Sequence, residues 1–449
     1  MGIDLGSRRI RSALALAVAM MALSVAVAAC GGEDNGASSS ASSSAASSTP
    51  TGDQSQTAAS KCGLGNGKKA TGTPIKLGAI ATKQPGTDFT DIPNMARAYF
   101  DCVNDNGGIN GRPIDYTIET EQTDPGQVAS LARKLVQSEK VLGIVGNTSI
   151  IECAVNHKYY EQQGYYVIDS GIAPECYSTP NSAAVNMGPR YSVDGATQYL
   201  IRQRVKKLVL DQSNVPGTGY IAGGFLLIAK DAKIPTKSLK DNVPIQDANS
   251  IALKLVQAAG PDGGVVLNFT PPEALKILQA AQRLGLQNRV KWACSTPCNT
   301  DFLADALGSA WDGKLGVNAE LNLIDADGPD SQLYRDVQKK YAPKLPLGSF
   351  SQMGFVEARI AVGALLKVKG EFTAKTVNTA FKNVRNFKTD ILCKPWYYGD
   401  APLHIPNNTD RTTTPQGGKM VQKEDCFPIS DVDPAIAQVR KIESGQSGQ

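Results

Sequence analysis

From residue 75 onward, short apolar runs alternate with longer stretches in which apolar residues recur every three or four positions. A short run bounded by turn residues is typical of a buried strand, and the longer spacing is typical of an amphipathic helix. In the first part of the chain the pattern predicts strands at 75–80, 113–120, 141–145 and 165–169, and helices at about 92–103, 126–138 and 151–163.

The same alternation restarts after residue 190, which predicts a second set of elements of similar size. The predicted strands are 207–210, 234–239, 264–268 and 290–293, and the predicted helices are about 194–204, 218–231, 247–259 and 271–284. Three more helices are predicted at 330–341, 352–369 and 373–385, followed by a segment rich in Pro, Gly and Asn with short strands. Strands that alternate with helices of this length indicate βαβ units and parallel sheets, so we expect two similar α/β lobes.

The N-terminus has the three parts of a secretory signal. Arginines, among them Arg8-Arg9, precede a run of apolar and small residues over 13–29, and the run ends in Val-Ala-Ala-Cys30. The run is short for a membrane span, which needs about 20 residues. Its end resembles a bacterial lipobox, which implies a signal peptide over 1–29 and lipid attachment to Cys30. Ordinary cleavage nearby and an uncleaved anchor stay open, as does the choice between Sec and twin-arginine export.

The residues after Cys30 favour the same interpretation. Residues 37–51 are almost entirely Ser, Ala and Thr. Such a segment cannot bury enough apolar surface to fold, so we expect a flexible tether over 30–72. About 40 residues of this composition have a root-mean-square reach of roughly 35 Å.

Charge and histidine content exclude several classes of function. The chain has 46 Lys and Arg against 42 Asp and Glu, and the segment 1–29 carries half of the formal charge of +4. A nearly neutral body argues against a nucleic-acid partner, for which a basic domain or stripe is expected. With only 2 His, the chain cannot form a multi-histidine metal site, and we expect no metal or cofactor.

The cysteines indicate disulfides. Setting Cys30 aside leaves an even number in an exported chain, which favours four bridges, although eight cysteines allow 105 pairings. Proximity in sequence favours Cys153–Cys176, Cys294–Cys298 and Cys393–Cys426, which leaves Cys62–Cys102. A zinc site at 294 and 298 is the alternative, but no second ligand pair lies at a suitable spacing.

No catalytic motif emerges from the sequence. The chain lacks a GxSxG elbow, a P-loop and a GxGxxG after a predicted strand. A catalytic triad would have to use His157, which lies beside Lys158 on an amphipathic helix, or His404, which lies in the Pro- and Asn-rich tail. A structural role is the simpler interpretation of both, so an enzyme is disfavoured.

Small polar loops follow several predicted strands. In open α/β sheets, ligands bind at the carboxyl ends of the strands. The loops in question are 82–90, 146–149, 170–173 and 295–297. Asn147, Thr148 and Ser149 also precede a predicted helix, where hydroxyls and free helix N–H groups could hold a carboxylate or amide oxygen. Plain capping of the helix explains the same three residues equally well, and both interpretations stay open.

One segment resembles a known family. Residues 103–114, Val-Asn-Asp-Asn-Gly-Gly-Ile-Asn-Gly-Arg-Pro-Ile, are similar to the N-x-x-GGI-x-G-x-x-(I/L) turn of the leucine/isoleucine/valine-binding proteins. These are the extracytoplasmic substrate-binding components of ABC importers. The resemblance continues through Asp124-Pro125 and 141–146, and it covers roughly 74–425.

The resemblance implies a fold and a domain layout. The fold is the type I periplasmic binding fold, with two doubly wound, Rossmann-like α/β lobes joined by a three-crossover hinge that encloses the ligand. The first lobe would comprise 73–190 and 318–385, the second 191–317 and 386–430, and 431–449 would form a C-terminal tail. A family disulfide between the loops after the third and fourth strands would match Cys153–Cys176.

The resemblance also implies a ligand site, formed by loops of both lobes. The implied contacts are Asp88, Phe89, Asn147, Thr148, Ser149, Ser170, Gly171, Ile172, Val215, Phe269, Thr270, Thr296 and Phe350. Two positions depart from the amino-acid binders of the family: Ala173 replaces a hydroxyl residue, and Thr296 replaces the acidic residue that neutralises the ligand ammonium. A buried ammonium without a countercharge is costly, so an amide, a carboxylic acid or another small polar metabolite fits better than an ordinary α-amino acid.

The sequence therefore predicts a monomeric, lipid-anchored, non-enzymatic solute receptor on the outer face of a bacterial membrane. It would deliver a small molecule to an ABC permease. A ligand sensor of the same fold that signals to a membrane partner is the first alternative, and an exported hydrolase is the second.

Overall fold

The computed structural model describes residues 61–446. The predicted signal peptide, Cys30 and most of the predicted tether lie outside the described residues, as do the last three residues of the predicted tail. No helix within 61–446 combines the length and the apolar character that a membrane span requires.

The first sheet has six strands. Five follow the order β2-β1-β4-β5-β6, and the sixth, β3, also pairs with β1. All pairs are parallel except β1 with β2, which form a short hairpin. The strands are β1 (Ile75–Gln84), β2 (Thr87–Asp88), β3 (Ile114–Glu121), β4 (Gly143–Asn147), β5 (Val167–Asp169) and β6 (Ser182–Ala184).

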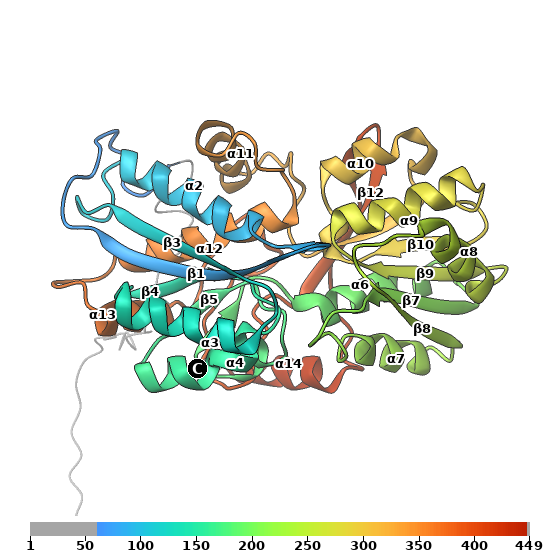
Figure 1. The fold of residues 1–449 in the computed structure, drawn as a ribbon, viewed down its shortest axis with the longest axis horizontal. Coiled ribbons are helices and arrows are strands. Elements are labelled where there is room, and N and C mark those ends of the chain that lie inside the picture. The colour runs from blue at the N-terminus through green and yellow to red at the C-terminus, as the bar shows by residue number, and fades with distance from the viewer. Residues whose placement is uncertain (1–60, 447–449) are drawn as a thin grey trace, which may run out of the picture. The chain divides into compact units, whose positions relative to one another are not determined.

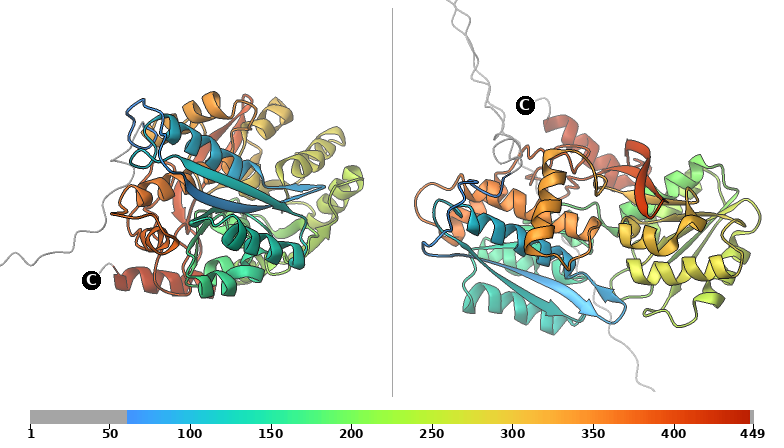
Figure 2. Two further views of the ribbon diagram at one scale, coloured as in Figure 1. Left: turned by 60° about the vertical axis from the view of Figure 1, so that its left-hand side comes forward. Right: turned by 90° about the horizontal axis from the view of Figure 1, so that it is seen from above.

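Helices cover both faces of this sheet (Figures 1 and 2). On one face lie α2 (Asp91–Asp105), α11 (Pro329–Tyr341), α12 (Ser349–Leu365) and α13 (Ala374–Lys382), which share one large apolar core with the sheet. On the other face lie α3 (Pro125–Arg133), continued by the π-helical turn Lys134–Ser138, and α4 (Glu152–Gln163). A parallel sheet covered on both faces is a doubly wound lobe.

The second sheet has seven strands in the order β13-β12-β11-β10-β9-β7-β8. The inner strands pair in parallel, and the two strands from the C-terminal part of the chain add an antiparallel edge. The strands are β7 (Lys207–Ser213), β8 (Thr236–Asp241), β9 (Gly263–Asn268), β10 (Lys291–Cys294), β11 (Leu315–Ala319), β12 (Thr409–Gln416) and β13 (Lys419–Pro428).

Two groups of helices sandwich the second sheet as well. One apolar core joins the sheet to α6 (Gly188–Arg202) and α7 (Ala222–Asp231). The other joins it to α8 (Ala248–Ala259), α9 (Pro271–Arg283) and α10 (Asp301–Leu307). The remaining elements are α5 (Glu175–Ser178), the 3₁₀ turns Thr296–Cys298 and Ser309–Trp311, and α14 (Pro434–Gln446).

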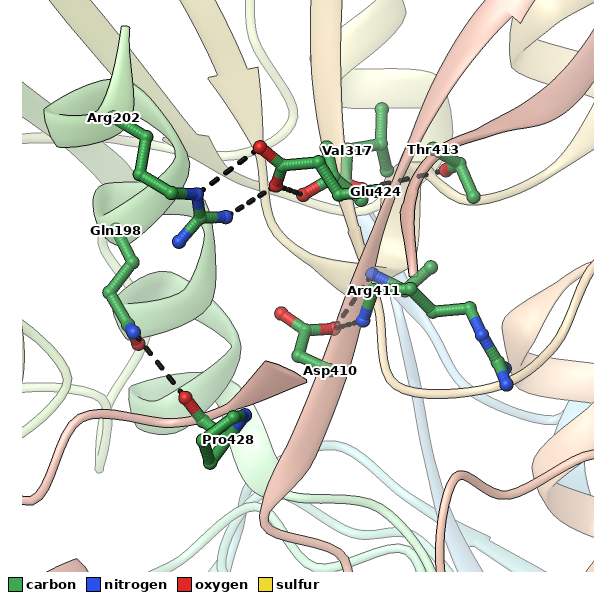
Figure 3. Close-up of polar contacts among 10 residues, drawn as sticks. Gln198, Arg202, Val317, Asp410, Arg411, Thr413, Glu424 and Pro428 are labelled. Atoms are coloured by element: carbon green, nitrogen blue, oxygen red, sulfur yellow. Dashed lines mark hydrogen bonds and ion pairs between the residues drawn. The ribbon is translucent and has the colours of Figure 1, made fainter. Parts of the chain in front are cut away.

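The antiparallel edge is tied to α6 by side chains (Figure 3). Arg202 Nε donates to Glu424 Oε1 at 3.2 Å, and Gln198 Nε2 donates to the carbonyl oxygen of Pro428 at 3.4 Å. Both acceptors lie on β13, so α6 holds the outermost strand of the sheet. Asp410 on β12 accepts instead from backbone N–H groups, including that of Ala319 on β11 at 3.0 Å.

The Gly-Gly-Ile segment that carries the family resemblance has a clear structural role. Asn104 Nδ2 donates to the carbonyl oxygen of Ile114 at 2.8 Å, and Asn104 Oδ1 accepts from the Ile114 N–H at 2.7 Å. The end of α2 is thereby joined to the start of β3. Gly108 has a φ of +57°, and an added Cβ would lie 2.3 Å from the carbonyl oxygen of Arg112, so a side chain is excluded there.

Three connections run between the two sheets, after β6, after β11 and before β12. A single side chain contacts all three: Asn407 Nδ2 donates to the carbonyl oxygens of Val185 and Glu320, each at 3.2 Å. The third connection leaves the first lobe later than the resemblance implies, because Phe387 and Trp396 pack in the core of that lobe. The residue ranges of the lobes stay a prediction, but this packing favours a crossing near residue 399 over one at 386.

The structure pairs the eight cysteines of the described part in the way that sequence proximity favours. The bridges are Cys62–Cys102, Cys153–Cys176, Cys294–Cys298 and Cys393–Cys426. The last of these ties a segment after α13 to β13, and the third closes a loop directly after β10.

Several elements differ from the sequence prediction. The expected loop at 82–90 contains the end of β1 and the hairpin strand β2, and the helix expected from 194 begins at Gly188. The elements β6, α5, α10, β11 and α14 were not predicted. Strand β6 has three residues, too few for a periodic pattern, and α14 lies in what the sequence presented as a tail.

Candidate functional site

A cavity lies where loops at the carboxyl ends of both sheets meet. Its volume is about 90 Å³. At about 10–15 Å³ for each water molecule, this is room for roughly six to nine waters, or for a ligand with a similar number of non-hydrogen atoms. The cavity therefore suits a small metabolite.

Aromatic and aliphatic side chains from both lobes form the apolar part of the wall. Phe89, which follows the β1–β2 hairpin, and Phe350, at the start of α12, make an edge-to-face contact with ring centroids 5.4 Å apart. Val215 and Phe269 face the cavity from the second lobe. An apolar wall with a few polar groups is typical of a small-molecule site.

Most of the residues predicted from the family resemblance line this cavity. They are Phe89, Thr148, Ser170, Ile172, Val215, Phe269, Thr270, Thr296 and Phe350. Four predicted residues, Asp88, Asn147, Ser149 and Gly171, are not among the lining residues. Ligand contact by the first group stays a prediction, and the second group has identifiable structural roles.

Hydrogen bonds explain why these four residues do not face the cavity. Asn147 Oδ1 accepts from the Ile80 N–H at 2.8 Å, and Ser149 Oγ accepts from the Ile151 N–H at 3.3 Å. Asp88 accepts from the N–H of Thr90 at 2.9 Å, just before α2. The carbonyl oxygen of Gly171 accepts from the Tyr177 hydroxyl at 2.7 Å and from Asn186 Nδ2 at 2.9 Å. The structure does not support helix capping by these side chains either, because Asn147 bonds to strand β1 and α4 begins after Ile151 without a side-chain cap.

Thr148 and Ser170 are two of the hydroxyl residues of the first lobe that line the cavity. Thr148 Oγ1 is buried and has no hydrogen-bond partner in the structure. Ser170 Oγ donates to Glu357 Oε1 at 2.5 Å. Burial raises the pKa of Glu357 well above its usual value. Because the Ser170 proton is engaged, its free lone pair is an acceptor for a ligand N–H or O–H.

The second lobe presents a hydroxyl network around Thr296. Ser192 Oγ donates to Thr296 Oγ1 at 2.8 Å, and Asn318 Nδ2 donates to the same oxygen at 2.8 Å. The N–H of Thr296 donates back to Ser192 Oγ at 2.7 Å. The disulfide Cys294–Cys298 brackets this turn, so the position of Thr296 is fixed both covalently and by hydrogen bonds.

Glu320 is one of several lining residues that sequence reasoning missed, and the one among them with an ionisable side chain. It follows β11 in the second connection between the sheets, it is 1% exposed, and its Oε2 accepts from the Met187 N–H. Burial raises the pKa of Glu320 to about 8, although hydrogen bonds from the Met187 N–H and the Thr296 hydroxyl lower it. The argument from Thr296 alone overlooks this carboxyl group, which reaches the cavity from the end of a different strand.

Among the lining residues of this cavity, Glu320 is the one with an ionisable side chain. His157 lies on α4 with its Nδ1 2.8 Å from the carbonyl oxygen of Cys153, and His404 is buried between the carbonyl oxygens of Ala401 and Ser182. Neither histidine lines the cavity. A cluster of Cys153, Asp169 and Cys176 has the spacing of metal ligands, but the two sulfurs are joined in a disulfide.

The model of the family described as periplasmic binding protein matches residues 74–413, which is most of the chain. The chain belongs to this family. The match spans the first sheet, the second sheet as far as β12 and all three connections, and it includes every lining residue of the cavity. A search of curated proteins by sequence gives no match.

Solved structures with the same fold include binding proteins for different solutes. A fatty acid ABC transporter substrate-binding protein from Thermomonospora curvata has a TM-score of 0.69 at 19% identity, with 82% of this chain and 96% of that chain covered. A branched-chain amino acid ABC transporter protein from Thermus thermophilus with bound valine has a TM-score of 0.72 at 16% identity, with 83% and 100% covered. A solute-binding protein from R. palustris in complex with benzoate has a TM-score of 0.65 at 18% identity, with 79% and 96% covered.

These neighbours support the resemblance to the leucine/isoleucine/valine-binding proteins and the two-lobed fold. Identities below 20% show the fold alone, and the solutes named for these proteins range from an amino acid to fatty and aromatic acids. Members of the family act outside the cytoplasm as solute-binding components of ABC transporters. The solute of this chain has to be argued from its own cavity.

Proposed function

We propose that this protein is the solute receptor of an ABC importer and captures a small amphipathic molecule in the cavity between its two sheets. The observation that carries the proposal is the cavity itself, which lies at the carboxyl ends of both sheets and beside the three connections. Its wall combines the Phe89–Phe350 pair with the buried hydroxyls of Thr148 and Thr296. Such a wall suits a ligand with one apolar and one polar end.

The rest of the proposed role rests on the N-terminal sequence and on the family. Cleavage before Cys30 and lipid attachment to its thiol would hold the receptor on the outer face of the membrane, and the Ser- and Ala-rich segment would serve as the tether. The partner would be an ABC permease in the same membrane, and the receptor would act as a monomer.

Thermal unfolding of the purified full-length chain in detergent tests the proposal. The panel comprises amino acids, amines, amides, carboxylates and sugars. A ligand at 100 times its dissociation constant should add about 2.7 kcal/mol to the free energy of unfolding, which is a clear rise in the midpoint.

Two phenylalanine variants test whether a ligand found in this way occupies the cavity. Phe350→Ala should abolish the ligand-induced rise, because it removes half of the aromatic pair. Phe372→Ala is the matched control, since Phe372 is also half-buried against the first core but does not line the cavity. No stabilisation by any panel member, or equal loss in both variants, would contradict the proposal.

A further inference from the structure

The charge distribution in the cavity points to a class of ligand. We propose that Glu320 makes the cavity selective for a ligand that carries a protonated amine, with the Glu320 carboxylate as its counter-ion. This inference rests on the proposed function, because it names the ligand that the same cavity would take. It departs from the sequence-based expectation, which favoured an amide or a carboxylic acid.

The carboxyl group of Glu320 is fixed at the hinge side of the cavity. Its Oε2 accepts from the N–H of Met187, in the connection that follows β6. The carbonyl oxygen of the same residue accepts from Asn407 Nδ2 at 3.2 Å, in the connection that precedes β12. With its backbone and one carboxyl oxygen held in this way, Glu320 presents a positioned group to the ligand without a large ordering cost.

Charge balance separates the ligand classes. Among residues 61–446, those that line the cavity include no Lys, Arg or His, and Glu320 is the one with an ionisable side chain. A bound ammonium paired with ionised Glu320 leaves no net charge in the cavity. A bound carboxylate leaves one uncompensated negative charge even when Glu320 is protonated, and a buried charge without a partner is costly. The cavity therefore favours amines over carboxylates of the same shape.

Two hydroxyls that line the same cavity suit the same ligand. The lone pair of Ser170 is free to accept because its proton is donated to Glu357, and Thr148 Oγ1 has no partner within the described part of the chain. An ammonium group carries several N–H donors and needs more than one acceptor. Phe89 and Phe350, which line the same cavity, form a wall for the apolar body of the amine.

Selection of an amine has a consequence for pH. Glu320, whose pKa burial raises to about 8, is protonated at neutral pH in the empty cavity, so binding of an ammonium must release a proton. The titratable groups that interact with Glu320 are Asp410 on β12 and Tyr177 on α5. Burial raises the pKa of each well above its usual value, and neither is a cation that could stabilise ionised Glu320. Affinity for an amine should therefore rise about tenfold for each pH unit between pH 6 and pH 8.

Isothermal titration with two matched series tests the inference on the full-length chain in detergent. The aromatic series is benzylamine, benzamide and benzoate, and the aliphatic series is 3-methylbutylamine, 3-methylbutanamide and 3-methylbutanoate. In at least one series the amine should bind ten times or more tightly than the carboxylate at pH 7. Titrations in buffers of different ionisation enthalpy should show release of close to one proton for each amine bound at pH 7 and below.

Two substitutions of buried carboxylic acids sharpen the test. Glu320→Gln should weaken binding of the amine tenfold or more, should abolish proton release and should change binding of the amide less than threefold. Glu152→Gln is the matched control, because Glu152 is buried in the first lobe outside the lining of the cavity, and it should leave the ratio of amine to carboxylate affinity unchanged. The proton count in the unmodified chain needs no variant, so a folding defect in Glu320→Gln would not decide the outcome.

The possible results separate this inference from the proposed function. A carboxylate that binds as tightly as its amine, or amine binding without proton release, overturns the role of Glu320 and leaves the solute receptor intact. Absence of binding by both series and by every member of the wider solute panel overturns the proposed function and this inference together.

Discussion

Replacement of Glu152 by Gln should make the protein more stable at neutral pH. Glu152 lies in the first turn of α4 and is 2% exposed, and Asn156 Nδ2 is 3.5 Å from its Oε1. Burial raises the pKa of this carboxyl from 4.5 to about 7, against the lowering effect of hydrogen bonds from neighbouring side chains. Folding therefore favours the protonated form, which an amide imitates in shape and in lack of charge.

The sign and size of the effect follow from proton linkage. Below the unfolded pKa of about 4.5, Glu152 is protonated in both states and its contribution to stability is fully present. As the pH rises to about 7, the unfolded state has lost the proton while the folded state still holds it, so the free energy of unfolding falls. One pKa unit corresponds to about 1.4 kcal/mol, so the total loss is on the order of 3 kcal/mol and levels off above pH 7.

Urea unfolding between pH 4.5 and pH 8.5 measures this contribution. The difference in unfolding free energy between Glu152→Gln and the unmodified protein should grow in favour of the variant as the pH rises, and should be largest above pH 7. Glu161→Gln, an exposed position on the same helix, should follow the pH profile of the unmodified protein. Parallel profiles for Glu152→Gln and the unmodified protein would refute the reasoning.

Two further predictions concern packing and cross-linking. An Ala at Gly354 in α12 would place its Cβ 1.9 Å from the carbonyl oxygen of Ile92, so Gly354→Ala should lower the free energy of unfolding by about 1–3 kcal/mol. At the control position, Gly445, an added Cβ would have no atom within 4 Å, so Gly445→Ala should raise the free energy of unfolding by up to about 1 kcal/mol. Equal midpoints in thermal unfolding would count against this packing. Replacing both Cys393 and Cys426 by Ser removes a bridge across 33 residues and should cost about 3–4 kcal/mol in urea unfolding, and a loss below about 1 kcal/mol would show that the bridge adds little.

The regular part of the fold could be predicted from the sequence because its signals are local. Periodicity located most strands and helices within a few residues, and the Gly-Gly-Ile segment pointed to a turn that Asn104 and Gly108 explain physically. Local signals failed where an element was too short to show a period, as at β6, or where an irregular segment packs as a helix only against distant residues. Helix α14 is such a case, since Ile436 and Val439 pack in a cluster with Met187 and Tyr191.

The candidate site shows the same contrast between local signals, which the sequence carries, and contacts with distant residues, which it does not. Loops after predicted strands supplied Thr148, Ser170 and Thr296, because the position of a loop at the end of a strand is a local property. Which side chain of a loop faces the cavity depends on competing hydrogen bonds, and Ser149 accepts instead from the N–H of Ile151, just before α4. Glu320 could not be placed in the same way, since it reaches the cavity only because the connections after β6 and β11 lie side by side.

The amide group of Asn407 has a mechanical consequence for the two lobes. Its two N–H bonds lie in one rigid plane, and they end on carbonyl oxygens of two other connections, those of Val185 and Glu320. A displacement of any one connection changes the geometry of a bond that the same planar group makes to another. The three connections are therefore coupled mechanically. A force that a bound ligand exerts on Glu320 is transmitted through Asn407 to the other two connections, so the hinge responds as a unit.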